Sequence, residues 1–507
     1  MKTIPHRYHA AGKRKIRQRL DKPITAPTSQ PVFTAANIHY EAATKTRGMA
    51  CGGIGAMPLL VRKLGLAEAI DERLHLLAFH FPYHESDHVL NFAYNALCNG
   101  TCLDDIELRR NDLVFLDALG ADRIPDPTTA GDFCRRFTVA DIETLQDVFD
   151  QTRIKVWHQQ PSDFFDEAIL DADGTLVATA ACCKQGVDIA YDGTWGYHPL
   201  IISLAHTGEI LRLVNRSGNR PSHEGAAAAF DRVIRLCRQA GFRRILLRGD
   251  TDFSQTRYLD GWDDDSVLFL FGIDAMPNLN VLAEDLPASR WVELHRPTPY
   301  TAQGPPRRRP EKVKDQIVRQ RGFETWTRIR EDVAEIAYRP TACDRPYRLI
   351  IVRQTIQVEK GQLRLHDEIR YRFFVTNDRE TAPCALVLKA NDRCNQENLI
   401  AQLKGGVHAL RAAVDNLVSN WAYMVMTALA WNLKAWFALS VPEHPRHRAA
   451  HREQKRALLG MEFKRFVNTI ILMPCQIVRG GRRLIYRLLS WNKWQGVFLR
   501  VVHALRC

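Results

Sequence analysis

The chain has 507 residues, of which 46% are hydrophobic and 25% are charged, and its formal net charge is +13. The length exceeds one ordinary domain and the hydrophobic content suffices for a core, so we expect a folded chain with several parts. The apolar run at 470–474 is far too short to span a bilayer, and the twelve cysteines include no pair of CxxC units. The sequence therefore argues against a membrane segment and against a zinc site.

The positive charge is concentrated toward the two ends of the chain. Residues 1–20 contain no acid, and the segment after residue 441 is rich in arginine, with Arg479, Arg482, Arg483 and Arg487. Counterion release makes nucleic acids the usual partners of such segments. We expect a basic arm at 1–50, in which three prolines interrupt any helix, and a basic helical region at 441–507. The alternative is that these basic segments are disordered tails that only increase solubility.

Between residues 51 and 160 the apolar residues recur with helical spacing, which predicts a helical DNA-binding domain. Thr128 or Thr129 is expected to cap a short helix that ends in Arg135 and Arg136. These adjacent arginines are candidates for contacts with DNA phosphates. The alternative is that this helix only packs within a small bundle.

The pattern changes to strands after residue 160. Strands are predicted at 168–177, 189–191, 198–205 and 209–214, then a helix at 222–240 and a strand at 244–248. This order opens an RNase H-like catalytic domain, an α/β fold with a mixed sheet and helices. Its first part is expected at 161–260 and its last part, which is helical, at 381–440. A β-rich insertion at 261–380, with a Pro/Arg patch at 305–310, separates the two parts.

Three aspartates occupy special places on these strands. Asp171 and Asp173 alternate along one strand and so project from the same face, and Asp250 follows the end of another strand. Buried carboxylates need a cation or a hydrogen-bond donor. Two Mg²⁺ ions bridged by such oxygens could activate an attacking oxygen and stabilise a leaving one in phosphoryl transfer. For Asp250, a turn or helix-capping role is the alternative.

The predicted helix at 393–404 adds a third acid between two cations. Arg393 and Glu397 are four residues apart and Lys404 is seven beyond Glu397, so all three share one helix face. A carboxylate for metal, flanked by cations for phosphates, suits a DNA strand-transfer site. An exposed helix with salt bridges is the alternative.

Taken in order, these motifs resemble DDE transposases of bacterial insertion sequences over roughly residues 50–440. The resemblance is greatest to the branch whose last motif is Tyr-x2-Arg-x3-Glu-x6-Lys, and within it to the insertion sequence 1380 group. The motif's Tyr would fall at Ala390, so a DNA contact through that Tyr is absent or moved. The matching segments are 170–175 (LDADGT), 196–200 (GYHPL), 248–253 (RGDTDF), 374–377 (FVTN) and 395–400 (NQENLI).

The resemblance implies a catalytic, metal-binding triad of Asp173, Asp250 and Glu397, with Asp171 as an alternate ligand. It also implies that Arg393 and Lys404 contact phosphates. Two Mg²⁺ ions, replaceable by Mn²⁺, would activate water to cut the element's end. The freed 3′-hydroxyl would then attack target DNA without a covalent enzyme intermediate; a DNA hairpin step stays open.

The implied partners are the terminal inverted repeats of the element and the target DNA, bound by a homodimer. The implied location is the bacterial cytoplasm, at the nucleoid when DNA is bound. The lack of a signal peptide and the scattered cysteines agree with an intracellular protein.

Two other functions compete with this interpretation. The segment 171–177 (DADGTLV) also resembles the first motif of haloacid dehalogenase-like phosphatases, with Asp171 as nucleophile. That fold needs parallel strands alternating with helices, and its late metal motif would need an acid at Ser254. The other alternative is a catalytically silent DNA-binding protein, although all three acids are present.

Overall fold

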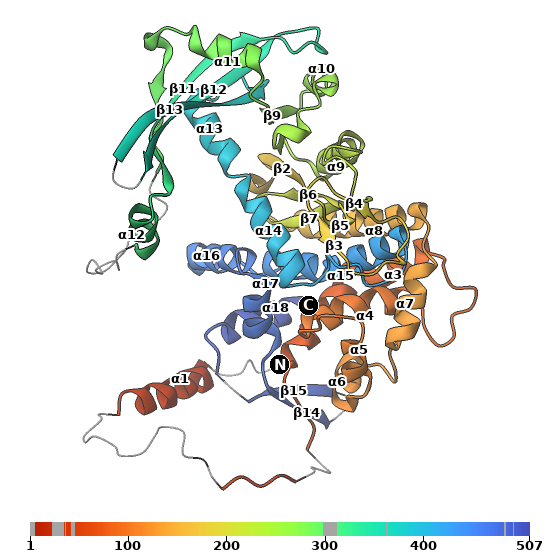
Figure 1. Cartoon of the computed structure of the whole chain (residues 1–507). Helices are drawn as coiled ribbons and strands as arrows, with labels where there is room; N and C mark the ends of the chain where they lie inside the picture. The colour runs from red at the N-terminus through yellow and green to blue at the C-terminus, as the bar shows by residue number, and fades with distance from the viewer. Residues whose placement is uncertain are drawn as a thin grey trace.

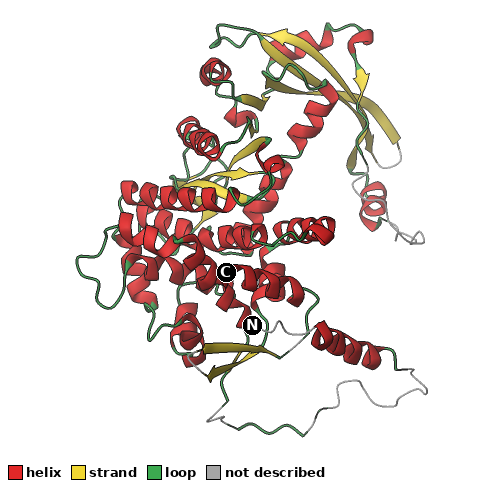
Figure 2. Ribbon diagram, turned by 180° about the vertical axis from the view of Figure 1, so that it is seen from behind, coloured by secondary structure: helices red, strands yellow, loops and turns green. Residues whose placement is uncertain are grey.

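A computed structural model describes the chain at 6–22, 35, 37–41, 46–297, 312–360, 363–480, 483–489 and 491–506. The Pro/Arg patch at 305–310 lies outside the described residues. Figures 1 and 2 show an elongated molecule with a β-rich lobe at one end, helices around a sheet in the middle, and a small sheet near the opposite end.

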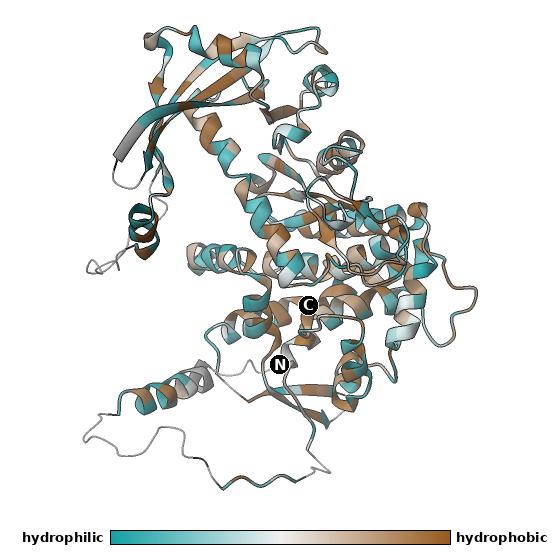
Figure 3. Cartoon of the chain, viewed as in Figure 1, coloured by the Kyte–Doolittle hydropathy of each residue, from teal (hydrophilic) through white to brown (hydrophobic). Residues whose placement is uncertain are grey.

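The middle of the molecule is helical on one side. Among the seven helices of residues 56–157, α2, α4, α7 and α8 contact α15. Helices α8 and α15 contact one edge of the sheet, and α15 is buried along almost its whole length. Figure 3 shows the outlying α16 as mainly hydrophilic, in contrast to this interior. The helices concerned are α2 (Ala56–Leu64), α3 (Leu66–Arg73), α4 (Glu85–Leu97), α5 (Asp105–Arg110), α6 (Leu113–Leu119), α7 (Pro127–Arg135), α8 (Val139–Trp157), α15 (Leu417–Leu439) and α16 (Arg448–Leu459).

A nine-stranded mixed sheet runs through the molecule in the order β10-β11-β12-β13-β9-β8-β2-β6-β7. Strands β2, β8 and β9 are parallel neighbours, whereas β6 lies antiparallel to β2. Helix α9 (Ala226–Ala240) contacts β6, β7 and β8. The strands are β2 (Glu167–Gly174), β6 (Leu200–Leu204), β7 (Glu209–Val214), β8 (Arg244–Gly249), β9 (Leu268–Ile273), β10 (Val292–Glu293), β11 (Glu324–Tyr338), β12 (Tyr347–Lys360) and β13 (Leu363–Thr376).

The predicted β-rich insertion is an extension of this same sheet. Its last strand, β13, pairs antiparallel with β9, so the inserted strands continue the sheet that carries the predicted site. The chain returns from β13 through α13 (Pro383–Asn391) to α14 (Cys394–Gly405), which packs on β2. Helix α10 (Leu259–Asp264) precedes β9, and helices α11 (Pro277–Glu284) and α12 (Val313–Gln320) lie between β9 and β11.

Two small sheets lie outside the main one. One has the order β3-β5-β4, and the other has the order β1-β14-β15 and joins residues near the start of the chain to residues near its end. None of the helices within the described ranges is both long and apolar enough to cross a membrane. The strands are β1 (Gly48–Met49), β3 (Val177–Ala178), β4 (Asp188–Ile189), β5 (Trp195–Tyr197), β14 (Cys475–Gly480) and β15 (Arg483–Leu488).

Several local predictions differ from the structure. The basic arm contains a helix, α1 (His6–Leu20), because none of its prolines falls between residues 6 and 20. The C-terminal region contains the hairpin β14–β15 before its last helix, α18 (Gln495–Arg506). Neither Thr128 nor Thr129 caps α7: Asp126 accepts from the Thr129 backbone N–H at 2.9 Å, and Pro127 takes the first helical position.

Candidate active site

Acids follow three neighbouring parallel strands at the same edge of the sheet. Asp173 lies near the end of β2, Asp250 directly follows β8, and Asp274 directly follows β9. Because parallel strands end at a common edge, these carboxylates gather there. Sequence reasoning missed Asp274, although an apolar run of strand length precedes it, as one precedes Asp250.

Asp173 is surrounded by charges of both signs. Burial raises its pKa to about 6, the charges of Asp250 and Glu397 add to this rise, and Arg393 opposes it. The Arg393 Nη1 lies 3.3 Å from Asp173 Oδ2, and both side chains are largely buried. The charges of Asp250, Glu397 and Arg393 therefore all act on the carboxylate of Asp173.

Asp250 has a similar environment. Burial raises its pKa, repulsion from Asp252 and Asp274 adds to the rise, and Arg393 again opposes it. Its Oδ1 also accepts from the Asp252 backbone N–H at 3.1 Å, so it caps the short turn after β8. Asp250 therefore caps a turn, as the alternative predicts, and the charge of Arg393 also acts on its carboxylate. Asp252 is a second acid that sequence reasoning did not single out.

Helix α14 brings the remaining predicted residues to this edge. Its buried Gln396 donates to the Ile201 carbonyl oxygen on β6 at 3.2 Å and accepts from the Ser203 hydroxyl. This anchor leaves Glu397 exposed in the first turn of the helix, close enough for its charge to act on Asp173. Lys404 is exposed in the last turn.

Asp171, the alternate ligand, is occupied by a buried ion pair. Arg248 Nε lies 2.7 Å from Asp171 Oδ1 and Arg248 Nη2 lies 2.8 Å from Asp171 Oδ2. Arg248 also donates to the backbone oxygen of Lys389 at the end of α13. Burial raises the pKa of Asp171 against the opposing effect of Arg248. Both carboxylate oxygens are thus taken by one guanidinium.

The structure does not bring Arg135 and Arg136 to the acids. Figure 1 shows α7 at the right of the molecule, away from α14. Arg135 forms ion pairs with Asp132 at 2.7 Å and Asp415 at 3.1 Å, which hold α7 to the segment before α15. Arg136 is exposed and has no ion pair with a described residue.

A divalent metal ion would need several of these acids around it. In the described part of the chain, no three His, Cys, Asp or Glu side chains lie close enough to hold one ion together. The donor chemistry nevertheless fits Mg²⁺, because Asp173, Asp250 and Glu397 offer hard oxygen atoms whose mutual repulsion a cation would relieve. Here the guanidinium of Arg393 supplies positive charge beside Asp173 instead.

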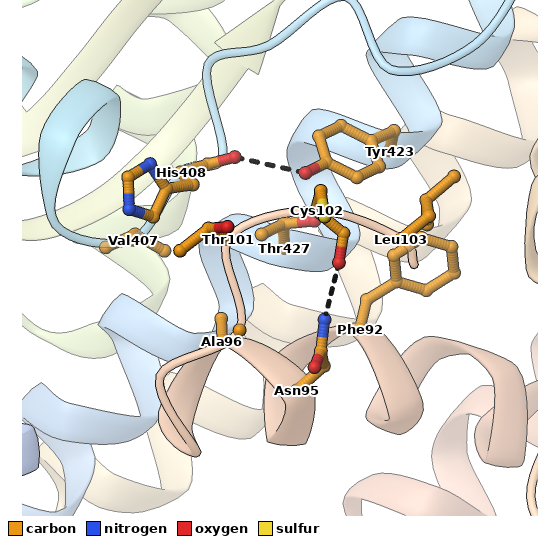
Figure 4. A pocket seen from close by; sticks show the side chains of 11 residues that line it. Phe92, Asn95, Ala96, Thr101, Cys102, Leu103, Val407, His408, Tyr423 and Thr427 are labelled. Atoms are coloured by element: carbon orange, nitrogen blue, oxygen red, sulfur yellow. Dashed lines mark hydrogen bonds between the residues drawn. The ribbon is translucent and has the colours of Figure 1, made fainter. Parts of the chain in front are cut away.

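A small cavity lies apart from this site, between α4, the loop that follows it, and α15 (Figure 4). Its volume is about 10 Å³, which suits about one water molecule. Tyr423 donates to the His408 carbonyl oxygen at 3.1 Å, and Asn95 donates to that of Cys102 at 3.0 Å. This cavity is too small for a substrate.

Comparison with known proteins gives a family match over most of the chain. Residues 49–506 match the model of the family described as transposase DDE domain group 1. No curated protein matches the sequence. A piggyBac transposase synaptic complex with hairpin DNA is a structural neighbour, with 11% sequence identity, coverage of 83% of this chain and 82% of that chain, and a TM-score of 0.37. The family match spans nearly the whole sequence, and the chain therefore belongs to the DDE transposases of group 1.

Proposed function

We propose that this DDE transposase cuts DNA at the ends of an insertion sequence and joins the freed 3′-hydroxyl to target DNA. One observation carries the proposal: Asp173 and Asp250 end adjacent parallel strands, and α14 brings Glu397 close enough to act on Asp173. We assign the order β7-β6-β2-β8-β9 to an RNase H-like core, with β10–β13 as its insertion.

In this proposal Asp173, Asp250 and Glu397 are the catalytic acids and the metal ligands. Two Mg²⁺ ions, or Mn²⁺, would supply Lewis-acid activation of the attacking oxygen when bound. Arg393 and Lys404 lie at opposite ends of α14 and hold phosphates on either side of Glu397. Arg393 then exchanges its ion pair with Asp173 for one with a phosphate. Asp171 positions β2 against β8 and binds no metal.

The partners in this proposal are the element's terminal inverted repeats and target DNA, bound by a homodimer. We further propose membership of the insertion sequence 1380 group and action at a bacterial nucleoid. Support for these assignments comes from the motif segments, because the family match itself is broader.

The decisive experiment is cleavage of a duplex that carries the element's own end, with Mg²⁺ or Mn²⁺, by wild type and by Asp250→Ala. We expect the variant to bind this duplex as wild type does and to lose metal-dependent cleavage by at least about a thousandfold, since it lacks a metal ligand. Asp285→Ala, which removes an exposed aspartate at the end of α11, is the matched control and should cleave normally. Persistent cleavage by Asp250→Ala would sink the proposal.

The same experiment separates the two alternatives. A phosphatase would hydrolyse an aryl phosphate without DNA, and a silent DNA-binding protein would bind the duplex without cutting it. The phosphatase interpretation is also weakened by the fold, since antiparallel β6 lies beside β2 and Asp171 is held by Arg248.

A further inference from the structure

Helix α1 carries positive charge that the rest of the described chain does not neutralise. Lys13, Arg14 and Arg17 are exposed, and none of them forms an ion pair with a described residue. No acid occurs in residues 1–20. One side of the helix meets Trp491: a Cβ added to Gly12 would lie 3.4 Å from the Trp491 Cβ. The cations therefore belong to a helix that is fastened to the C-terminal region.

The C-terminal region has the same imbalance of charge. From residue 454 to the end of the chain, Glu462 is the only acid. Lys464 and Arg465 on α17 (Phe463–Phe466) and Lys493 before α18 are exposed. Within the described ranges these three cations also have no ion pair.

Specific contacts join these cations to the helix of the candidate active site. Near Lys404, the Gln402 side chain of α14 accepts from the Phe463 backbone N–H at 2.9 Å. Asn492 donates to the Thr469 carbonyl oxygen, just after α17, at 2.6 Å. Trp491, the neighbour of Asn492, then meets α1. A continuous path of contacts thus runs from α14 through α17 and the segment before α18 to α1.

Several arginines elsewhere in the described structure are neutralised by acids, in contrast to the cations of this path. Arg345 forms ion pairs with three aspartates, and Arg212 forms ion pairs with two. Exposed cations without a protein partner are free to bind the regular row of phosphates that a DNA duplex presents. Release of counterions from that duplex would drive its binding.

We propose that Lys404, Lys464, Arg465, Lys493 and the cations of α1 form one phosphate-binding track for duplex DNA. The track starts at the catalytic helix, and α1 holds the duplex at its far end. This inference rests on the proposed function, because the Lys404 end of the track belongs to the proposed active site. We take the bound DNA to be double-stranded, since the described residues of the track supply cations for phosphates and no row of exposed aromatic side chains for stacking bases.

The test is the salt dependence of binding to a long duplex carrying the element's end, measured by fluorescence anisotropy. Lys13→Gln/Arg14→Gln/Arg17→Gln should lower the slope of log K against log salt by about 2–3, at roughly 0.9 for each phosphate that the variant no longer neutralises. The control, Arg235→Gln/Arg238→Gln/Arg243→Gln, removes three exposed cations on and after α9 and should leave the slope unchanged. Two of these arginines have partners in the protein, since Arg243 pairs with Asp166 and Arg238 donates to the Asp265 carbonyl oxygen. Because α1 is exposed, circular dichroism should show that both triple variants stay folded.

A series of shorter duplexes tests the geometry. When the duplex is shortened from the end far from the cleavage site, the slope of log K against log salt for wild type should fall until it equals that of the α1 triple variant. Equal slopes for wild type and the α1 variant on the long duplex would overturn the track, as would equal competition by single-stranded DNA. If wild type binds the duplex with a steep salt dependence but does not cleave it, the proposed function is wrong. The phosphate-binding track would still be supported by that result.

Discussion

Asp171 and Asp173 are two residues apart on one strand, but their surroundings differ. Asp171→Asn leaves the buried Arg248 without its charged partner, so we expect the free energy of unfolding to fall by roughly 3–5 kcal/mol. Asp173→Asn removes a carboxylate that burial and two like charges disfavour, so the apparent Tm should stay or rise. Thermal unfolding with and without Mg²⁺ checks both variants.

The change in Tm on adding Mg²⁺ distinguishes Asp173 from Asp171. The rise in Tm on adding Mg²⁺ should persist in Asp171→Asn and vanish in Asp173→Asn, because only Asp173 is proposed as a ligand. The reverse pattern would show that Asp171 is the first catalytic acid. Asp285→Asn serves again as the exposed control.

Sequence reasoning placed both aspartates on one strand face, and β2 agrees. It left the choice between them open because the deciding residue, Arg248, is 77 residues away from Asp171. Only the parallel register, in which Asp171 lies opposite Arg248, makes the pair visible. Asp274 was missed for a related reason: its position at the site depends on β9 pairing with β8.

At the scale of elements, α14 depends on one buried amide for its docking. Gln396→Leu removes its hydrogen bonds to Ser203 and Ile201 and should let Glu397, the next residue, shift. Because displacements near 1 Å can cost about a hundredfold in rate, we expect cleavage to fall by roughly 10–100-fold while DNA binding changes little. Single-turnover cleavage measures the loss.

Ser203→Ala supplies the matched test of this docking. It removes the same hydrogen bond from the β6 side, so the double variant should lose hardly more cleavage than Gln396→Leu alone. Strictly additive losses would mean that Gln396 does not act through β6.

Elements with strong local signals were predicted well, and those set by distant partners were not. Helix α9 and strand β7 lie close to where periodicity predicted them. Strands β12 and β13 were predicted as part of a β-rich region at 261–380, but their length comes from pairing with each other. The hairpin β14–β15 was taken for helix because its mixture of Ile, Leu and Arg does not alternate clearly.

At the scale of the whole molecule, the C-terminal region is not a separate appendage. β1 pairs with β14, α18 packs on α2, and Gly53 lies directly against Ile470. A Cβ on Gly53 would come within 1.8 Å of the Ile470 carbonyl oxygen, so the backbone would have to move. We expect Gly53→Ala to lower the free energy of unfolding by about 1–3 kcal/mol, seen as a lower Tm.

Gly496→Ala is the control for this prediction. A Cβ at Gly496, within α18, would meet nothing within 4 Å, and alanine favours a helix by roughly 0.5–1 kcal/mol. Its Tm should therefore stay or rise. If both alanine variants melted alike, the packing of residue 53 against residue 470 would not contribute to stability.

The pairing of β1 with β14 joins segments that are made at very different times during synthesis. A ribosome makes Gly48 and Met49 long before their partners Gln476 and Cys475. Glu397, too, is made long after Asp173 and Asp250. A nascent chain therefore holds Asp173 and Asp250 before Glu397 exists, and its β1 has no partner strand until β14 has been made. The order of synthesis thus separates the proposed third acid from the first two, and separates β1 from its partner strand.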